Sequence, residues 1–414
     1  MKKLAIVVTH PIQYYVPVFR LLAKQCFLKV FYSWGADGIN AKYDPGFGKT
    51  IAWNVPLLDG YDYELLENMA KVPGSHHGKG IINPDIVTKI KAFSPNAILV
   101  YGYIYHSHFK LMRHFKGKIP IWFRGDSTLL DKENPVKSII KKYFLKWMYS
   151  HVDKAFYVGT NNKAYFKKYG LKENQLIFCP HAVDNERFSE DRKKEVAELR
   201  ESLGVDNDSI LILFAGKLEH KKNPDLLLKA LKKLVTRQKE KLQSKINQDE
   251  ADLSCKKSKI EIPHAITSIH LLFVGNGVLE NNLKVQSSNL ASQIHFIDFQ
   301  NQMQIPMFYQ ACDIFCLPSQ GPGETWGLAV NEAMAASKAI IVSDKVGCAI
   351  DLVQKGKNGE IFRSESIDGL VNAIQLLAKD KKILQDYGQE SFQIIQNWSF
   401  EKQAEAIIYK LNEL

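Results

Sequence analysis

Two series of short apolar runs constrain the fold of this chain more than any other feature. The first series lies at residues 4–8, 27–32, 97–100, 119–123 and 154–158, and the second lies at 210–215, 269–274, 295–297, 314–317 and 339–342. Runs of this length, separated by amphipathic helical patterns, are typical of strands that are buried on both faces of a parallel sheet. The sequence therefore predicts an α/β fold with two doubly wound, Rossmann-like parallel sheets.

A length of 414 residues agrees with two domains, because a single hydrophobic core rarely grows to this size. We expect an N-terminal domain over 1–184, a linker over 185–206, a C-terminal domain over 207–396 and a last helix over 397–414. A charged stretch at about 235–263 almost lacks aromatic residues. It predicts either a solvated helix or a disordered insertion in the second domain.

Charge and cysteine content narrow the expected partners and location. The net charge of +11 favours an anionic neighbourhood, and an anionic membrane surface is the partner most worth testing. No nucleic-acid-binding motif accompanies this charge, so we expect no nucleic acid partner. The six cysteines show neither zinc nor disulfide spacing, and no apolar run approaches the roughly 20 residues that span a bilayer. The sequence therefore predicts a cytoplasmic protein with at most peripheral contact at the inner face of the plasma membrane.

Two carboxylates follow the apolar run 314–317. Glu324 lies in a loop rich in glycine and proline, and Glu332 lies eight positions later in a helix that we expect to begin near Gly327. Open α/β sheets bind ligands at the carboxyl ends of their strands, so both side chains can face one cleft and accept hydrogen bonds from hydroxyl groups. By itself, this stretch is equally consistent with Glu324 as a helix cap and Glu332 as a solvated residue.

Two lysines favour the binding interpretation. Lys217 and Lys222 follow the run 210–215, just before a helix that we expect to begin near Asn223. They therefore lie at the ligand-binding edge of the same sheet. Ammonium groups at this position can neutralise a diphosphate without a metal ion.

With these residues in view, the C-terminal half resembles the family-four retaining glycosyltransferases of the GT-B fold, from about residue 150 to 400. The motifs that carry the resemblance are Pro180-His181-Ala182-Val183-Asp184, Gly216-Lys217-Leu218 with Lys222-Asn223, Val274-Gly275-Asn276-Gly277, Glu324 with Glu332, and Val346-Gly347 with Asp351-Leu352-Val353. The family usually has arginine where this chain has Lys217, so the class of donor is better indicated than the donor sugar. Residues 44–50 and 57–61 resemble, more loosely, transferases of bacterial polysaccharide assembly.

The resemblance implies a nucleotide-sugar donor, a glycan or lipid-linked acceptor, retention of configuration, and no metal ion or other cofactor. It implies that Lys217 and Lys222 hold the donor diphosphate, that Glu332 binds ribose and that Glu324 contacts the transferred sugar. The wider donor-binding set that it implies is Gly216, Gly275, Phe299, Gln300, Trp326, Gly327 and Leu328. It also implies a C-terminal helix that crosses back to the first domain.

The acceptor side departs from the family's pattern. The first strand is followed by His10 and Gln13, which we expect either to contact the acceptor or to stabilise the turn. Where many relatives carry a histidine, this chain has Arg124 and Asp126, and we expect Asp126 to be the catalytic group on this side. Their expected neighbours are Tyr103, His106 and His108, although either histidine could equally lie at the surface.

Two other functions stay open on the sequence. Nucleotide-sugar epimerases and hydrolases of GT-B type would share the donor motifs, but they turn over the donor without an acceptor. A non-catalytic, sugar-nucleotide-binding partner of an envelope-assembly complex would also share them, although two glutamates and two lysines together argue against lost catalysis. A dinucleotide-dependent dehydrogenase is disfavoured, because no G-x-G-x-x-G follows Val8.

Overall fold

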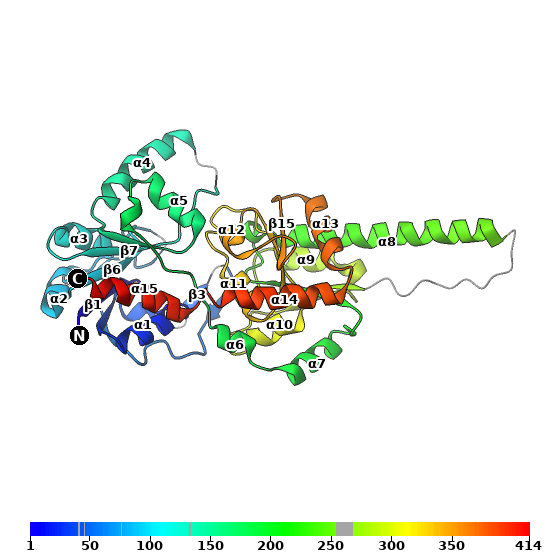
Figure 1. Cartoon of the computed structure of the whole chain (residues 1–414), viewed down its shortest axis with the longest axis horizontal. Helices are drawn as coiled ribbons and strands as arrows, with labels where there is room; N and C mark the ends of the chain where they lie inside the picture. The colour runs from blue at the N-terminus through cyan, green and yellow to red at the C-terminus, as the bar shows by residue number, and fades with distance from the viewer. Residues whose placement is uncertain (40–41, 45, 76, 132–133, 254–267) are drawn as a thin grey trace. The chain divides into compact units, whose positions relative to one another are not determined.

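The computed structural model describes residues 1–39, 42–44, 46–75, 77–131, 134–253 and 268–414. The chain divides into two compact units. Unit 1 comprises Met1–Asp44, Lys49–Asn185 and Ile395–Leu414, and unit 2 comprises Pro45–Gly48 and Glu186–Ile394. Each unit is built around its own parallel sheet (Figure 1), which confirms the predicted pair of Rossmann-like sheets.

The sheet of unit 1 has seven strands in the order β5-β2-β1-β6-β7-β8-β9, and neighbouring strands pair in parallel. The strands are β1 (Lys3–Val8), β2 (Phe27–Tyr32), β5 (Asp62–Leu65), β6 (Ala97–Tyr101), β7 (Ile121–Arg124), β8 (Lys154–Tyr157) and β9 (Leu176–Phe178). The helices are α1 (Val16–Ala23), α2 (Ile86–Phe93), α3 (His106–Phe115), α4 (Pro135–Tyr149), α5 (Thr160–Lys168) and α15 (Phe400–Asn412). The strand order reverses between β1 and β6, and the carboxyl edge at such a point is the usual ligand-binding position in this class of fold.

Alternate side chains of β1 point to opposite faces of the sheet, as the period of a strand requires. Leu4, Ile6 and Val8 pack in a core that contains residues of α1 and α15, whereas Ala5 and Val7 pack in a core that contains residues of α2 to α5. The C-terminal helix α15 therefore covers one face of the N-terminal sheet. This arrangement confirms the expected return of the last helix to the first domain.

The sheet of unit 2 has six strands in the order β12-β11-β10-β13-β14-β15, again all parallel. The strands are β10 (Ile210–Ala215), β11 (Ile269–Val274), β12 (Ile294–Ile297), β13 (Ile314–Leu317), β14 (Ala339–Ser343) and β15 (Gly359–Phe362). The helices are α6 (Asn185–Ser189), α7 (Lys193–Ser202), α8 (Pro224–Leu253), α9 (Glu280–Gln286), α10 (Ile305–Ala311), α11 (Leu328–Ala335), α12 (Ala349–Leu352), α13 (Ile367–Leu377) and α14 (Lys381–Ile395). Every residue of β10, β11 and β13 is buried, which explains why these strands read as continuous apolar runs.

The structure contains several strands that the apolar runs do not predict. Strands β5, β9 and β15 lie at the edges of the two sheets, and the antiparallel hairpin of β3 (Lys42–Asp44) and β4 (Lys49–Ile51) stands apart from both. Edge strands are short and only partly buried, so they carry few consecutive apolar residues. Strand β5, with the sequence Asp-Tyr-Glu-Leu, has no fully buried position.

The structure changes the expected domain organisation in one segment and adds detail in another. The segment 185–206, expected as a linker, contains α6 and α7, and its residues from Glu186 onward group with unit 2. The guanidinium of Arg200 on α7 donates to the Ala311 carbonyl at 2.8 Å and pairs with Asp313 at 3.1 Å, which fastens α7 to this unit. The charged stretch from 235 continues α8 as far as Leu253, and the rest of it lies outside the described residues.

Among the residues that the structure describes, none of the helices combines the length and the apolar character needed to cross a bilayer.

Candidate active site

Lys222 and Glu324 meet at the carboxyl edge of the unit 2 sheet. The strands β10 and β13 are parallel neighbours. Lys222 lies in the segment that follows β10, and Glu324 lies in the loop that follows β13. Lys222 Nζ lies 2.8 Å from Glu324 Oε2, and the Ser319 hydroxyl donates to the same oxygen at 3.1 Å. The pair is largely withdrawn from solvent, so its attraction is less screened than that of a surface ion pair. The carboxylate is therefore held by an ammonium group and does not cap a helix.

Glycine residues bring the neighbouring loops into backbone contact. A Cβ atom at Gly275 would lie 2.1 Å from the Gly216 carbonyl oxygen, and one at Gly277 would lie 2.5 Å from the Leu218 carbonyl oxygen. The loops after β10 and β11 can approach this closely only because these positions have no side chain. The glycines of the motifs thus set the shape of the sheet edge beside Lys217.

The loop that carries Glu324 is held by a second loop. Gly347 N donates to the Glu324 carbonyl oxygen at 3.1 Å, and a Cβ atom at Gly347 would lie only 1.7 Å from the Thr325 carbonyl oxygen. Helix α11 begins at Leu328 after Gly327, whose φ of 96° lies in the left-handed region, and no side chain caps this helix. The start of a helix carries backbone amides that can bind an anion, and here the N-cap residue supplies no side-chain cap.

Two other members of the predicted donor set, Glu332 and Trp326, are buried and bonded to neighbouring side chains. Glu332 is buried on α11, and its Oε2 accepts a hydrogen bond from the Tyr309 hydroxyl at 2.7 Å. The interpretation of Glu332 as a solvated residue is therefore wrong. The buried Trp326 ring donates from Nε1 to Asn331 Oδ1 at 2.8 Å, so its side chain supports the loop.

Lys217, Phe299 and Gln300 lie near the ends of β10 and β12. Lys217 Nζ is 5.1 Å from the ring centroid of Phe47, a residue of the short segment that groups with unit 2. The Phe47 ring in turn lies 4.8 Å from the ring of Phe299. Gln300 Nε2 donates to the Asp298 carbonyl oxygen at 3.1 Å. The two phenylalanine rings meet edge to face, at an interplanar angle of 61°, and place apolar surface beside a cation, which is the chemistry that a nucleobase next to a phosphate would meet.

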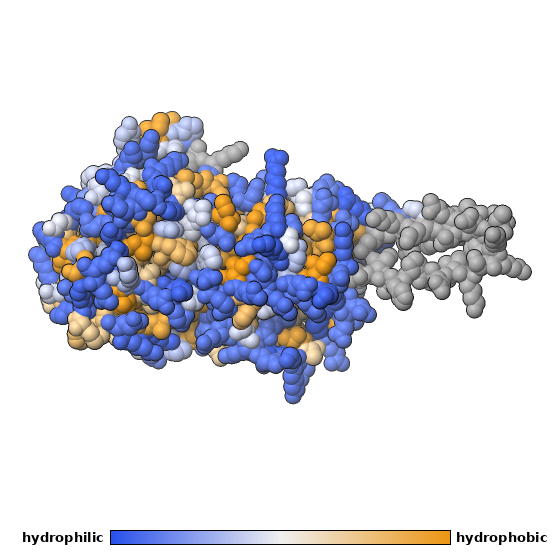
Figure 2. Space-filling model, viewed as in Figure 1, coloured by the Kyte–Doolittle hydropathy of each residue, from blue (hydrophilic) through white to orange (hydrophobic). Residues whose placement is uncertain are grey.

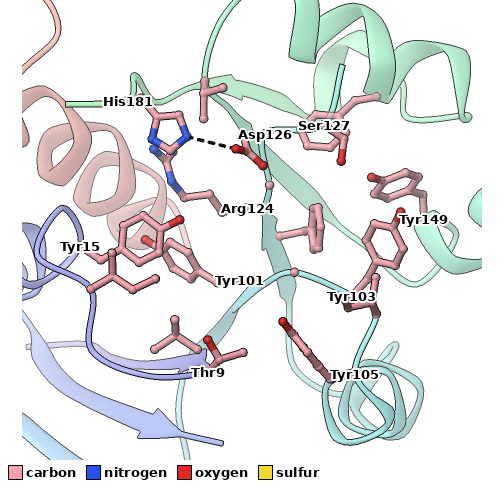
Figure 3. Close-up of a pocket in the computed structure, with 18 residues that line it drawn as sticks. Thr9, Tyr15, Tyr101, Tyr103, Tyr105, Arg124, Asp126, Ser127, Tyr149 and His181 are labelled. Carbon is pink, nitrogen blue, oxygen red and sulfur yellow. Dashed lines mark ion pairs between the residues drawn. The ribbon is translucent and has the colours of Figure 1, made fainter. Parts of the chain in front are cut away.

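A cavity of about 250 Å³ opens in unit 1 near the carboxyl ends of β1, β6 and β7 (Figure 3). Its aromatic lining residues are Tyr15, Tyr101, Tyr103, Tyr105, Phe123, Tyr149 and Phe166. Burial is the main cause that raises the pKa of Tyr15 to about 12, so this hydroxyl keeps its proton at neutral pH. The polar lining is supplied by Thr9, Arg124, Asp126, Ser127 and His181.

His181 and Asp126 form the polar corner of this cavity. His181 Nε2 lies 3.9 Å from Asp126 Oδ2 (Figure 3), and burial lowers the pKa of His181 below its ordinary value. Arg124 is buried behind them and donates to the carbonyl oxygens of Cys179 at 2.7 Å and Pro180 at 3.0 Å. Arg124 therefore positions the segment that carries His181.

The structure brings together only part of the predicted acceptor set. Tyr103, Arg124 and Asp126 line the cavity, but His10, Gln13 and His106 do not. The His10 ring packs edge-on against Trp34 at 5.4 Å, with Nδ1 2.8 Å from the Thr9 hydroxyl, which agrees with a turn-stabilising role. His106 is exposed at the start of α3.

His108 and His181 show what the sequence pattern missed. His108 is fully buried, with Nε2 2.8 Å from the Ser33 hydroxyl, so it is neither a cavity residue nor a surface residue. His181 belongs to a recognised motif but was not expected at the acceptor side. The available signal was the histidine itself, because its side chain adds a group that can titrate near neutral pH.

Comparison with known proteins finds relatives that match mainly unit 2. Residues 195–393 match the family model described as "Glycosyl transferases group 1". A D-inositol 3-phosphate glycosyltransferase of Catenulispora acidiphila is 25% identical over 243 residues, which cover 58% of this chain and 52% of that protein. An N,N'-diacetylbacillosaminyl-diphospho-undecaprenol alpha-1,3-N-acetylgalactosaminyltransferase of Campylobacter jejuni is 25% identical over 258 residues, which cover 61% and 58%. The matched part thus spans only about half the length of these relatives.

Solved structures show the fold over the whole chain. Anabaena HepE in complex with UDP and glucose matches with a TM-score of 0.66 at 16% identity and covers 100% of both chains. A glycosyltransferase from Rickettsia africae matches with a TM-score of 0.70 at 14% identity and covers 100% of this chain and 98% of that one. The chain has the GT-B fold, and its residues 195–393 match the family model of the group 1 glycosyl transferases.

Proposed function

We propose that this protein transfers a sugar from a nucleotide-sugar donor to a glycan or lipid-linked acceptor with retention of configuration. The observation that carries the proposal is the Lys222–Glu324 pair, held at the carboxyl edge of the unit 2 sheet beside the uncapped start of α11. An ammonium group and helix-start amides suit the negative charge of a diphosphate, and a carboxylate can accept hydrogen bonds from sugar hydroxyls. The complex of HepE with UDP and glucose supports a donor of the same class.

On the donor side, Lys217 and Lys222 would neutralise the diphosphate, and the amides at Trp326, Gly327 and Leu328 would bind its oxygens. Glu324 would accept hydrogen bonds from the hydroxyls of the transferred sugar. Glu332 would accept hydrogen bonds from the ribose, and Phe299 and Gln300 would contact the base. Neither a metal ion nor another cofactor is part of the proposal, because lysines and amides can stabilise the departing nucleoside diphosphate directly.

On the acceptor side, the aromatic cavity of unit 1 would hold the acceptor, with Asp126 and His181 at its polar corner. Aromatic walls suit the apolar faces of sugar rings, and tyrosine hydroxyls suit their polar rims. The acceptor oxygen would attack the anomeric carbon from the side of the departing diphosphate. The bond from that carbon to the phosphate oxygen would break, and the acceptor proton would pass to a diphosphate oxygen.

The biological setting of this transfer is also part of the proposal. The Campylobacter relative acts, by its name, on an undecaprenol-linked sugar, which supports a role in bacterial cell-surface polysaccharide synthesis. Such acceptors lie at a membrane, and the net charge of +11 suits an anionic one. The protein would therefore work in the cytoplasm, peripherally at the inner face of the plasma membrane.

Two measurements test the proposal and separate it from its rivals. A panel of nucleoside diphosphates and nucleotide sugars is screened by thermal shift, and at least one should raise the midpoint of unfolding. The best donor, labelled in its sugar, is then incubated with and without an extract of lipid-linked glycans. Label should move to the extract with its anomeric configuration unchanged by NMR. Equal turnover of donor without any acceptor would instead indicate an epimerase or hydrolase, and binding without turnover would indicate a non-catalytic partner.

A further inference from the structure

Helix α4 presents an apolar stripe to solvent. The large exposed hydrophobic residues on this helix are Val136, Ile139, Ile140, Tyr143, Phe144 and Trp147. The spacing 136, 139, 140, 143 and 147 places most of them on one face of a helix. Ile140 and Tyr143 are 67% and 71% exposed, so this face is not covered by unit 1. Figure 2 shows hydrophobic atoms at the solvent side of α4.

The opposite face of α4 holds the helix on its unit. Leu145, Met148 and Tyr149 are buried in the same core as α3 and α5. The helix is therefore apolar both toward the core and toward solvent, which is costly in water. An exposed apolar stripe on a firmly packed helix indicates a surface that meets another apolar phase.

The charges around this stripe favour one partner. Helix α4 carries four lysines and the adjoining helix α3 carries Lys110 and Arg113, while neither helix contains Asp or Glu. Lys137 lies on one side of the stripe, and Lys142 and Lys146 lie on the other. The guanidinium of Arg113 from α3 lies 5.7 Å from the Trp147 ring. An apolar stripe flanked by cations is the pattern of a helix that lies in the interface of an anionic bilayer.

We infer that α4 docks unit 1 on an anionic lipid bilayer, with its apolar stripe in the lipid and its lysines at the headgroups. The inference rests on the membrane setting of the proposed function and names the surface responsible. A second copy of this chain fits less well, because a two-fold contact through α4 would bring the lysines of both copies together.

The position of α4 relative to the aromatic cavity extends this inference. The Phe144 ring lies 6.5 Å from the ring of Tyr103, and Tyr103 and the α4 residue Tyr149 both line the cavity. Docking through α4 would therefore hold the cavity close to the membrane surface. An acceptor with a lipid anchor could then present its head to the cavity while its anchor stays in the bilayer.

Vesicle flotation with the full chain tests the inference. Vesicles of pure phosphatidylcholine are compared with vesicles that contain phosphatidylglycerol, at low and at high salt. The two α4 variants are Ile140→Glu and the double variant Lys142→Gln/Lys146→Gln. Their matched controls are Val285→Glu, at a position on α9 that is 75% exposed, and Lys193→Gln/Lys194→Gln, whose side chains on α7 are 91% exposed.

We expect the wild type and both controls to bind the anionic vesicles and to bind neutral ones much less. The partition coefficient should fall roughly tenfold or more for each α4 variant. Equal binding by Ile140→Glu and the wild type, or no binding by the wild type, would overturn the inference. If the wild type sediments as a dimer and Ile140→Glu sediments as a monomer, while both bind vesicles equally, the stripe would be a contact with a second copy of this chain instead. Binding of a nucleoside diphosphate to each variant is measured separately, so a failure of docking does not count against the donor site.

Discussion

Lys222 Nζ lies 2.8 Å from Glu324 Oε2, although the two residues are 102 positions apart in the sequence. The contact exists because β10 and β13 are parallel neighbours whose carboxyl ends face the same edge. The carboxylate accepts a hydrogen bond from the ammonium group. A diphosphate that binds Lys222 would therefore have to compete with Glu324 or share the lysine with it.

This relationship predicts different results for the two partners. Lys222→Ala should weaken nucleoside diphosphate binding about tenfold or more, because a charge-assisted contact is lost. Glu324→Gln should leave that affinity unchanged or raise it, since the lysine is released, while sugar transfer falls on the order of a hundredfold. Titration calorimetry and a transfer assay measure the two effects. Unchanged affinity in Lys222→Ala would contradict the proposed diphosphate contact.

The buried contact between Tyr309 and Glu332 separates ribose binding from diphosphate binding. Glu332→Gln should lower the affinity for a nucleoside diphosphate by about tenfold, because the carboxylate accepts stronger hydrogen bonds than an amide. It should leave the affinity for inorganic pyrophosphate unchanged. Tyr309→Phe is the matched control, since it keeps the carboxylate and should cost only about 1 kcal/mol of unfolding free energy. Equal losses for both ligands in Glu332→Gln would argue against a ribose contact.

A substitution at Gly347 tests whether its close contact with the loop that carries Glu324 stabilises that loop. A Cβ atom there would lie 1.7 Å from the Thr325 carbonyl oxygen, so Gly347→Ala must displace one of the two loops. We expect a loss of about 1–3 kcal/mol in unfolding free energy, together with weaker donor binding. Gly74→Ala serves as the control, because no heavy atom lies within 4 Å of its added Cβ. Similar stability losses in both variants, seen by urea denaturation, would refute the proposed close contact.

His108 predicts a dependence of stability on pH. Burial is the main cause that lowers the pKa of His108 from 6.5 to about 4. As the pH falls, His108 is therefore protonated near pH 6.5 in the unfolded chain but only near pH 4 in the folded chain. The unfolding free energy should therefore fall as the pH decreases from about 6.5 to about 4, by roughly 3 kcal/mol in total, and this residue should add no dependence above that window.

The His108 effect is measured as a difference between variants. Urea denaturation of the wild type and of His108→Gln at several pH values between 7.5 and 4.5 removes the contribution of the other titrating groups. The wild type should lose more stability than the variant across this range. Parallel curves would show that His108 is not the source of the dependence.

Part of this molecule can be predicted from local sequence, and particular elements show why. The strands β10, β11 and β13 are buried on both faces, so their apolar runs are continuous and predict them directly. Strand β5 is an edge strand, and its polar sequence carries no such signal. The positions of Lys217 and Glu324 after strands were likewise predictable, because a strand followed by a loop fixes which edge of a parallel sheet the loop occupies.

Other features depend on contacts between distant segments. His181 lies beside Asp126 because the buried Arg124 binds the carbonyl oxygens before it, and nothing within the segment itself predicts that interaction. The exposed apolar stripe of α4 could not be predicted from the sequence either, because apolar residues alone do not show which face of the helix packs against the core. The sequence by itself determined the class of fold and the edge of the donor site, since these follow from local periodicity. Only the tertiary structure decided which side chains share a cavity, an ion pair or solvent, since burial and pairing arise when remote segments pack together.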